Sequence, residues 1–257
     1  MNRQQAHAPL LTAADPPPVE VVNGASGAPL VLLCEHAGQA IPEALGSLGL
    51  EPGVIGTHRG WDIGAEALAR RVAAALEAPL IIQRYSRLVA DCNRPPESAD
   101  FAPAEVDGAA IPGNRAISDA DRAARRAAIF DPMNDTLDAA FDGAARRAAF
   151  SVHSFTPEFG GEGRPWHAGF LTRHDIPTAE RMLAHVAAED PSLTLALNQP
   201  YQIDGVSDWF IPAHAEARGL AHTLIEVRND QLRDEAGIDR WAEMLTGAIG
   251  AVMETQT

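Results

Sequence analysis

The sequence predicts an α/β fold with a mixed, mainly parallel sheet flanked by helices. Short apolar runs alternate along the chain with amphipathic helical segments, and this alternation is typical of parallel sheets covered by helices. The run from Leu30 to Cys34 is continuously apolar and stops at Glu35-His36, as a strand buried on both faces would. Polar groups follow several such runs, and ligands bind beyond the carboxyl ends of strands in open sheets.

The length of 257 residues is compatible with one large α/β domain or two small ones. We expect residues 1–18, which include three consecutive prolines, to form a flexible leader, and residues 19–257 to form a single domain. The net charge of −15 argues against nucleic acid and anionic membranes as partners. The two cysteines, Cys34 and Cys92, form no CxxC motif, which argues against a zinc ribbon or disulfide scaffold. No signal-peptide core or membrane-length apolar stretch is visible, so we expect a cytoplasmic protein.

The first half of the chain predicts four strands and one clear helix. A strand at 19–22 ends before the turn signal Asn23-Gly24, and the opening buried strand ends near His36. The segment 65–76 is helical because Leu68, Val72 and Leu76 recur at a spacing of four residues. The apolar segments 79–82 and 88–90 predict two further strands. Residues 95–117 are rich in proline, glycine and acids, which indicates a binding loop or lid.

The second half predicts three helices and four strands. A helix begins at Ser118, which can cap it with Asp121 in a capping box, and runs to about residue 148 with a break at Pro132. The other helices are expected at 177–188 and 235–252, and the strands at 150–152, 166–171, 193–197 and 222–230. The last helix keeps one face apolar.

Four of these strand ends carry reactive groups: His36, the segment Asp91-x-Asn93-Arg94, His153 and Glu226. Each alone has an ordinary structural explanation, but together they predict a site at one edge of the sheet. Two histidines and one carboxylate, with a water as fourth ligand, make a catalytic zinc site. A separate glutamate would move the proton, and an arginine would hold a carboxylate of the substrate.

Five sequence motifs contain these strand-end residues and indicate a protein family. CEHAGQAIP, HRGWDIGA, SRLVADCNRP, SVHSFTP and LIEVRND occur in this order between Val31 and Trp241. Together they resemble the N-formylglutamate amidohydrolase family, which is related to zinc carboxypeptidases and aspartoacylases. The resemblance implies a phosphorylase/hydrolase-like fold and Zn²⁺ as cofactor.

The resemblance also implies roles for the strand-end residues. His36 and His153 would bind zinc, Asn93 and Arg94 would bind the substrate carboxylate, and Glu226 would be the general base. Arg87 is a second candidate for carboxylate binding or for stabilising the oxyanion.

The carboxylate ligand of the metal is less directly implied. Carboxypeptidase-like proteins keep a glutamate three residues after the first histidine, where this chain has Gln39. We therefore expect Asp62 to be the ligand, although it also fits an N-terminal cap of the following helix. Glu35 is the alternative ligand, but adjacent strand residues point to opposite faces, which disfavours sharing a metal with His36.

Other assignments have ordinary alternatives. Arg94 could pair with Asp91, and Glu226 with Arg228. His167, His214 and His222 are weaker candidates for orienting a ligand or touching substrate, and the cysteines are most simply buried apolar residues.

The expected function is that of a zinc-dependent amidohydrolase acting on a small anionic N-acyl amino acid. N-formyl-L-glutamate is the substrate named by the family, and formate and L-glutamate would be the products. The pocket should then be locally basic around Arg94. The alternatives are a deacylase or carboxypeptidase for another N-acyl amino acid or small peptide, and a non-catalytic protein that binds a metal or small molecule.

Overall fold

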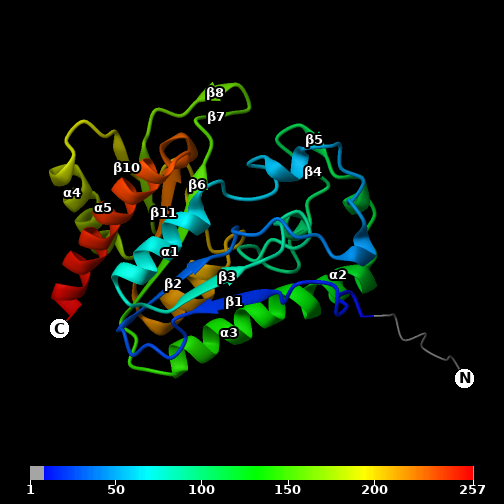
Figure 1. Cartoon of the computed structure of the whole chain (residues 1–257), viewed down its shortest axis with the longest axis horizontal. Helices are drawn as coiled ribbons and strands as arrows, with labels where there is room; N and C mark the ends of the chain where they lie inside the picture. Colours follow the sequence, from blue (N-terminus) through cyan, green and yellow to red (C-terminus); the bar gives the residue numbers. More distant parts are fainter. Residues whose placement is uncertain (1–8, 257) are drawn as a thin grey trace, which may run out of the picture.

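A seven-stranded sheet with the order β1-β3-β2-β6-β11-β9-β10 forms the centre of the computed structural model, which describes residues 9–256 (Figure 1). The strands are β1 (Val19–Val22), β2 (Leu30–Cys34), β3 (Leu80–Gln83), β6 (Ala148–Phe155), β9 (Ala168–Leu171), β10 (Leu195–Leu197) and β11 (Ala221–Arg228). Strands β3, β2, β6 and β11 run parallel to their neighbours within this group, β1 and β9 pair antiparallel with β3 and β11, and β10 is parallel to β9. The predicted mixed, mainly parallel sheet is confirmed.

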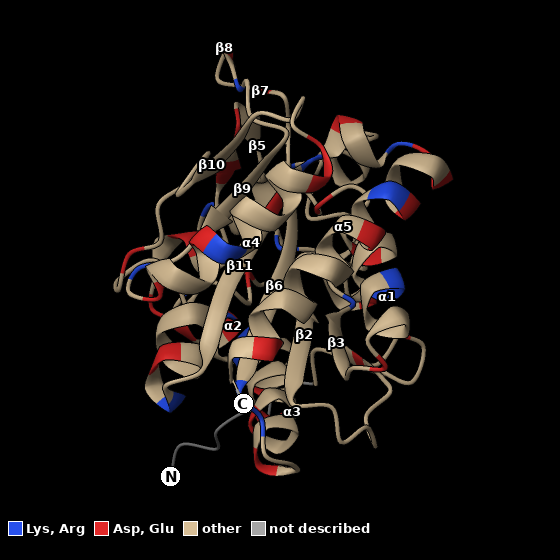
Figure 2. Cartoon of the chain, turned by 90° about the vertical axis from the view of Figure 1, so that its left-hand side faces the viewer, with Lys and Arg blue, Asp and Glu red and all other residues tan. Residues whose placement is uncertain are grey.

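Helices cover both faces of the sheet. Helices α1 (Ala65–Ala75), α4 (Ile176–Glu189) and α5 (Glu235–Met253) pack on one face, and α3 (Asp131–Asp142), preceded by α2 (Asp119–Arg125), lies on the other (Figure 1). Acidic residues and arginines are interspersed on the outer helices (Figure 2). Two small hairpins, β4–β5 (Glu105–Val106 and Ala109–Ala110) and β7–β8 (Glu158–Phe159 and Glu162–Gly163), project from the body. Among residues 9–256, no helix combines the length and apolar character needed to cross a bilayer.

Short helical segments occupy many of the connections. They are η1 (Glu43–Leu45), η2 (Val54–Gly56), η3 (Ala99–Phe101), η4 (Pro112–Asn114), η5 (Arg126–Phe130), η6 (Ile211–Ala215), η7 (Glu216–Arg218), η8 (Asn229–Leu232) and η9 (Glu254–Gln256).

Strand alternation decides which face carries the polar groups. On β6, Phe150 and Val152 pack into the core under α1, α4 and α5, so Ser151 and His153 point to the opposite, α3 face. Strand β11 is paired in register so that Glu226 lies opposite His153. Both side chains therefore leave the sheet on the α3 face, where the long connections can enclose them.

Most predicted elements are present, and their bounds differ at a few places. The strand predicted at 88–90 is wrong: β3 ends at Gln83, and the apolar residues form a turn in which Val89 N donates to Ser86 O. This short segment is buried among loops with no neighbouring strand to pair with. The capping box of Ser118 and Asp121 is confirmed. The helix predicted from it is interrupted by the π-helical segment η5, directly before Pro132.

The predicted leader lies partly outside the described residues, which exclude 1–8. Its later part contacts the body, since the carbonyl oxygens of Pro16 and Pro18 accept hydrogen bonds from Tyr85 Oη and Arg84 N. The loop after β2 also packs against the segment after β3. A Cβ on Gly38 would lie 1.9 Å from Arg84 O, so only glycine permits this close approach.

Candidate metal centre and active-site pocket

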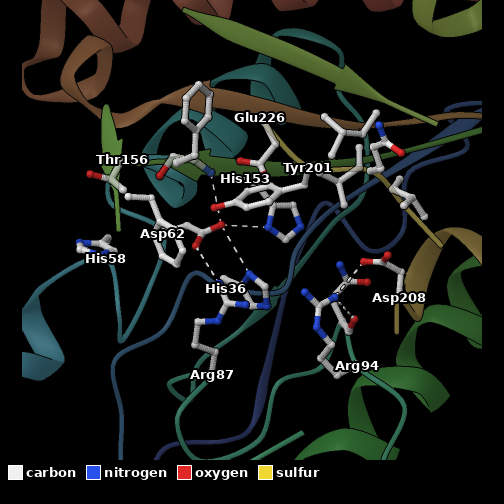
Figure 3. Close-up of a pocket in the computed structure, with 18 of the residues that line it drawn as sticks. His36, His58, Asp62, Arg87, Arg94, His153, Thr156, Tyr201, Asp208 and Glu226 are labelled. Carbon is white, nitrogen blue, oxygen red and sulfur yellow. Dashed lines mark hydrogen bonds and ion pairs between the residues drawn. The ribbon is translucent and has the colours of Figure 1, made fainter. Parts of the chain in front are cut away.

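A cavity of about 240 Å³ opens at the carboxyl ends of the central strands, on the α3 face (Figure 3). Its lining includes all seven residues singled out from the sequence, namely His36, Asp62, Arg87, Asn93, Arg94, His153 and Glu226. These residues come from five separated segments of the chain. The predicted convergence of strand ends therefore exists in the fold.

The three expected metal ligands form one buried group. His36, Asp62 and His153 each offer a ligand atom, and these atoms lie within 4.8 Å of one another. Asp62 Oδ2 lies 2.9 Å from His153 Nδ1 and 3.5 Å from His36 Nδ1. His36 Nδ1 is buried and has no hydrogen-bond partner among residues 9–256, as expected of a lone pair directed at an ion. This donor set, two imidazoles and a carboxylate, fits a divalent metal such as zinc.

The helix-cap interpretation of Asp62 is wrong. Helix α1 has Gly64 at its N-cap, with no side-chain cap, and Asp62 instead turns into the pocket. Its Oδ2 accepts a hydrogen bond from Ser154 N, and the backbone N–H of Asp62 donates to His36 O. Gln39, at the position of the carboxypeptidase glutamate, is exposed.

A second carboxylate lies behind each histidine. Asp91 Oδ1 is 2.8 Å from His36 Nε2, and Glu35 Oε2 is 3.1 Å from His153 Nε2. Glu35 is held in turn by Ser151 Oγ, which donates to it at 2.5 Å. Glu35 therefore does not join the three-residue group, and its carboxylate instead lies on the far side of His153.

The metal-free group is strongly polarised. Burial disfavours the charged form of Asp62. The charges and hydrogen bonds of His36 and His153 outweigh this effect of burial and hold the pKa of the Asp62 carboxyl below its usual range. Burial likewise disfavours the His153 imidazolium, but Glu35 and Asp62 hold its pKa well above the usual value. Without metal, the site therefore keeps a proton on His153 between two carboxylates.

Glu226 has a different environment. Its side chain is 5% exposed, and its Oε2 has no hydrogen-bond partner within the described residues. Burial raises the pKa of Glu226 to about 7, although His153 opposes the shift. Arg228 pairs with Asp230, at 2.8 Å, so the alternative pairing of Glu226 with Arg228 is wrong.

The arginines of the pocket are already paired. Arg87 Nη2 lies 2.8 Å from Asp91 Oδ2, and Arg94 Nη1 lies 2.8 Å from Asp208 Oδ1. The suggested Arg94–Asp91 pair is thus replaced by two other pairs. The expected locally basic pocket is not found, because carboxylates offset these cations.

The side-chain oxygen of Asn93 is hydrogen-bonded within the protein, and its amide nitrogen is not. Its Oδ1 accepts hydrogen bonds from the backbone N–H groups of Trp209 and Phe210. This contact ties the segment after β3 to the loop that precedes η6. The amide nitrogen of Asn93 makes no hydrogen bond to the described residues, and Asn93 is one of the residues that line the pocket.

The other histidines considered from the sequence lie elsewhere. None of His167, His214 and His222 lines the cavity. Each forms a hydrogen bond elsewhere: His167 with Thr194, His214 with Asn134 and His222 with Leu220. Both cysteines are buried and free.

Several lining residues were missed from the sequence. They are His58, Thr156, Tyr201 and Asp208. His58 stands in the HRGWDIGA motif four residues before Asp62, and Thr156 stands in the SVHSFTP motif three residues after His153, so both proximities are available signals. Nothing local marks Tyr201 and Asp208, since their loop folds over the site from a distant part of the chain.

Comparisons with known proteins show the family of the chain and its likeness of fold to solved structures. A family described as N-formylglutamate amidohydrolase matches residues 28–233. A gene product of Agrobacterium tumefaciens of solved structure is 37% identical, with a TM-score of 0.89 and coverage of 96% of this chain and 100% of that one. N-formylglutamate amidohydrolase from Ralstonia eutropha JMP134 is 18% identical, with a TM-score of 0.64 and coverage of 93% and 98%, which is a likeness of fold. A comparison with curated proteins finds no match.

Proposed function

Because the chain belongs to the N-formylglutamate amidohydrolase family and is a hydrolytic enzyme acting on an amide, we propose that it cleaves N-acyl amino acids with a bound zinc ion. The supporting observation is the buried group of His36, Asp62 and His153 beside the unpartnered carboxylate of Glu226. N-formyl-L-glutamate, which gives the family its name, is the reference compound of the substrate class.

In this proposal His36 and His153 hold the metal through Nδ1, and Asp62 through a carboxylate oxygen. Zinc bound there supplies Lewis-acid chemistry, which polarises the acyl carbonyl and lowers the pKa of water. Asp91 and Glu35 keep the two imidazole rings oriented from behind. Their negative charges also make the imidazole nitrogens more basic, which strengthens their binding to the metal.

Glu226 carries the proton in the proposed reaction. It takes a proton from the attacking water, whose oxygen forms the new bond to the acyl carbon. It then delivers that proton to the amide nitrogen as the C–N bond breaks, so a carboxylic acid and an amine are formed, and the acid's proton passes to the amine to give a carboxylate and an ammonium. Its buried position and a pKa of about 7 suit a group that must accept and return a proton near neutral pH.

The cationic side chains position the substrate. Arg87 stands 3.7 Å from Asp62 Oδ1 and is suited to stabilise negative charge on the carbonyl oxygen. Arg94 Nη1 is engaged by Asp208 and by Asn93 O, while its Nε and Nη2 have no hydrogen-bond partner among the described residues. Those two nitrogens, with the Asn93 amide, can receive the α-carboxylate of the substrate.

The direct test combines metal analysis with a hydrolysis screen. We expect the purified protein to carry about one equivalent of divalent metal, and to hydrolyse N-formyl, N-acetyl or longer N-acyl amino acids only when metal is bound. Activity that survives complete removal of metal by a chelator would contradict the proposed role of zinc.

Glu35→Gln is expected to weaken metal binding by roughly 10- to 100-fold, the usual effect of losing an outer partner of a metal-bound histidine. The variant keeps the size of the side chain but removes the charge facing His153. Competition with a chelator measures the affinity directly, without relying on turnover.

Gln39→Glu is the matched control for this measurement. It changes an exposed side chain four residues away and adds a carboxylate where carboxypeptidase-like proteins keep one. Its metal affinity should equal that of the wild type. An unchanged affinity in Glu35→Gln would rule out the positioning role.

Arg94→Ala is expected to raise KM by about 10- to 100-fold for substrates with a free α-carboxylate, since a charged hydrogen bond contributes about 1.5–3 kcal/mol. The corresponding α-carboxamide should be affected much less. Steady-state kinetics on the acid and its amide separate the two cases. An equal loss on both compounds would mean that Arg94 acts through the architecture of the pocket.

A further inference from the structure

The arginines of the pocket are paired with carboxylates before any substrate enters. All lining residues belong to the described part of the chain, and the two arginines among them pair with Asp91 (Arg87) and with Asp208 (Arg94). His58 Nε2 lies 2.9 Å from Asp107 Oδ2. Arg94 retains two unused donor nitrogens for one carboxylate. A second carboxylate of the substrate would find no comparable unpaired cation among these lining residues.

One part of the cavity wall is apolar. Leu171, Ile203 and Leu224 line the cavity and are 2%, 9% and 4% exposed. Leu171 and Leu224 are paired across β9 and β11. Leu224 precedes Glu226 by two residues, so both side chains lie on the same face of the sheet.

The loop before η6 brings this apolar wall and the carboxylate-binding pair together. Ile203 and Asp208 both belong to this loop, and Asp208 holds Arg94. Figure 3 shows Arg94 and Asp208 on one side of the His36–Asp62–His153 group, and His58 and Thr156 on the other. The pocket therefore has two sides with the reacting centre between them.

We propose that the amino-acid part of the substrate lies on the Arg94 side with an apolar side chain against Leu171, Ile203 and Leu224. This inference rests on the proposed function and makes it narrower: the substrates are N-acyl derivatives of apolar amino acids, with leucine and methionine as representatives. The γ-carboxylate of glutamate would be buried against three aliphatic side chains without a partner. Such burial costs more free energy than one charged hydrogen bond returns.

The acyl group then points to the opposite side. His58 and Thr156 lie on that side (Figure 3). Phe159, three residues after Thr156, also lines the cavity and is 40% exposed.

The test compares N-formyl-L-leucine with N-formyl-L-glutamate on the metal-loaded wild-type protein. We expect kcat/KM to favour the leucine derivative by at least about tenfold, as discrimination by an apolar pocket commonly does. Preference for the glutamate derivative, or equal values, would overturn this inference and leave the proposed function intact. Failure to hydrolyse any N-acyl amino acid of the wider screen would overturn both.

A second experiment places a positive charge among the three aliphatic side chains of the apolar wall. Ile203→Arg should reduce the leucine-to-glutamate ratio of kcat/KM by at least about tenfold, because it supplies a partner for the γ-carboxylate. Val206→Arg is the control, since it adds the same charge to the same loop at a side chain that is 84% exposed and does not line the cavity. Its ratio should match the wild type. If both variants change the leucine-to-glutamate ratio of kcat/KM equally, the change comes from the added charge and not from its position. The apolar wall would then not be the binding site of the amino-acid side chain. If Ile203→Arg does not fold, the wild-type comparison still decides the inference.

Discussion

Glu226→Gln is expected to lower kcat by about 10²- to 10⁴-fold, the usual contribution of a general acid–base group, while the content of bound metal stays unchanged. Glutamine preserves the size of the side chain but can neither accept nor return the proton. Metal should remain because Glu226 lies outside the group of His36, Asp62 and His153. Single-turnover kinetics and elemental analysis of the same preparation give both quantities.

Glu158→Gln is a suitable control for Glu226→Gln. It removes an exposed carboxylate from β7, in the hairpin at the mouth of the cavity, and should leave kcat near the wild-type value. Wild-type turnover in Glu226→Gln would exclude Glu226 as the base. Loss of metal together with turnover would instead indicate that Glu226 helps to hold the metal.

His153→Ala is expected to lower metal affinity by more than about 100-fold, because it removes a donor atom and not only its outer partner. Turnover should fall with metal occupancy. The variant also leaves Glu35 and Asp62 buried opposite each other without their shared cation, which destabilises the metal-free protein. Circular dichroism and thermal unfolding must therefore accompany the chelator competition, and His153→Gln, which keeps a polar side chain of similar size, serves if the alanine variant does not fold.

His167→Ala is the matched histidine control. His167 lies outside the cavity, and its Nδ1 accepts a hydrogen bond from Thr194 N. Metal affinity should match the wild type in this variant. Full retention of metal by folded His153→Ala or His153→Gln protein would exclude His153 as a ligand.

Local sequence patterns predict the main strands and helices of this protein correctly, but not every short apolar segment in its loops. The buried strand from Leu30, the helix from Ala65 and the capping box at Ser118 follow from local patterns, and the fold contains all three. The segment 88–90 was misread because three apolar residues in a buried turn have the same local pattern as a short strand. Strand pairing depends on neighbours, which a short window of sequence does not contain.

The candidate site shows the same division. Residues at strand ends were recognisable because a buried strand predicts where its polar end emerges. Asp62 was ambiguous between cap and ligand until the fold placed its carboxylate 2.9 Å from His153 Nδ1. Glu35 and His36 follow the end of β2 in a turn, so strand alternation does not decide how their side chains lie; the pairing of β2 with β6 brings Glu35 behind His153.

The sequence by itself determined the class of sheet, the family and the residue types that the chemistry needs, because periodicity and ordered motifs are properties of the chain. Tertiary structure alone decided how the charges are paired. Asp208 is 114 residues from Arg94, yet this contact offsets the cation around which the sequence predicted a basic pocket. Folding brings such pairs within the short range of hydrogen bonds and ion pairs, and a linear pattern carries no record of that distance.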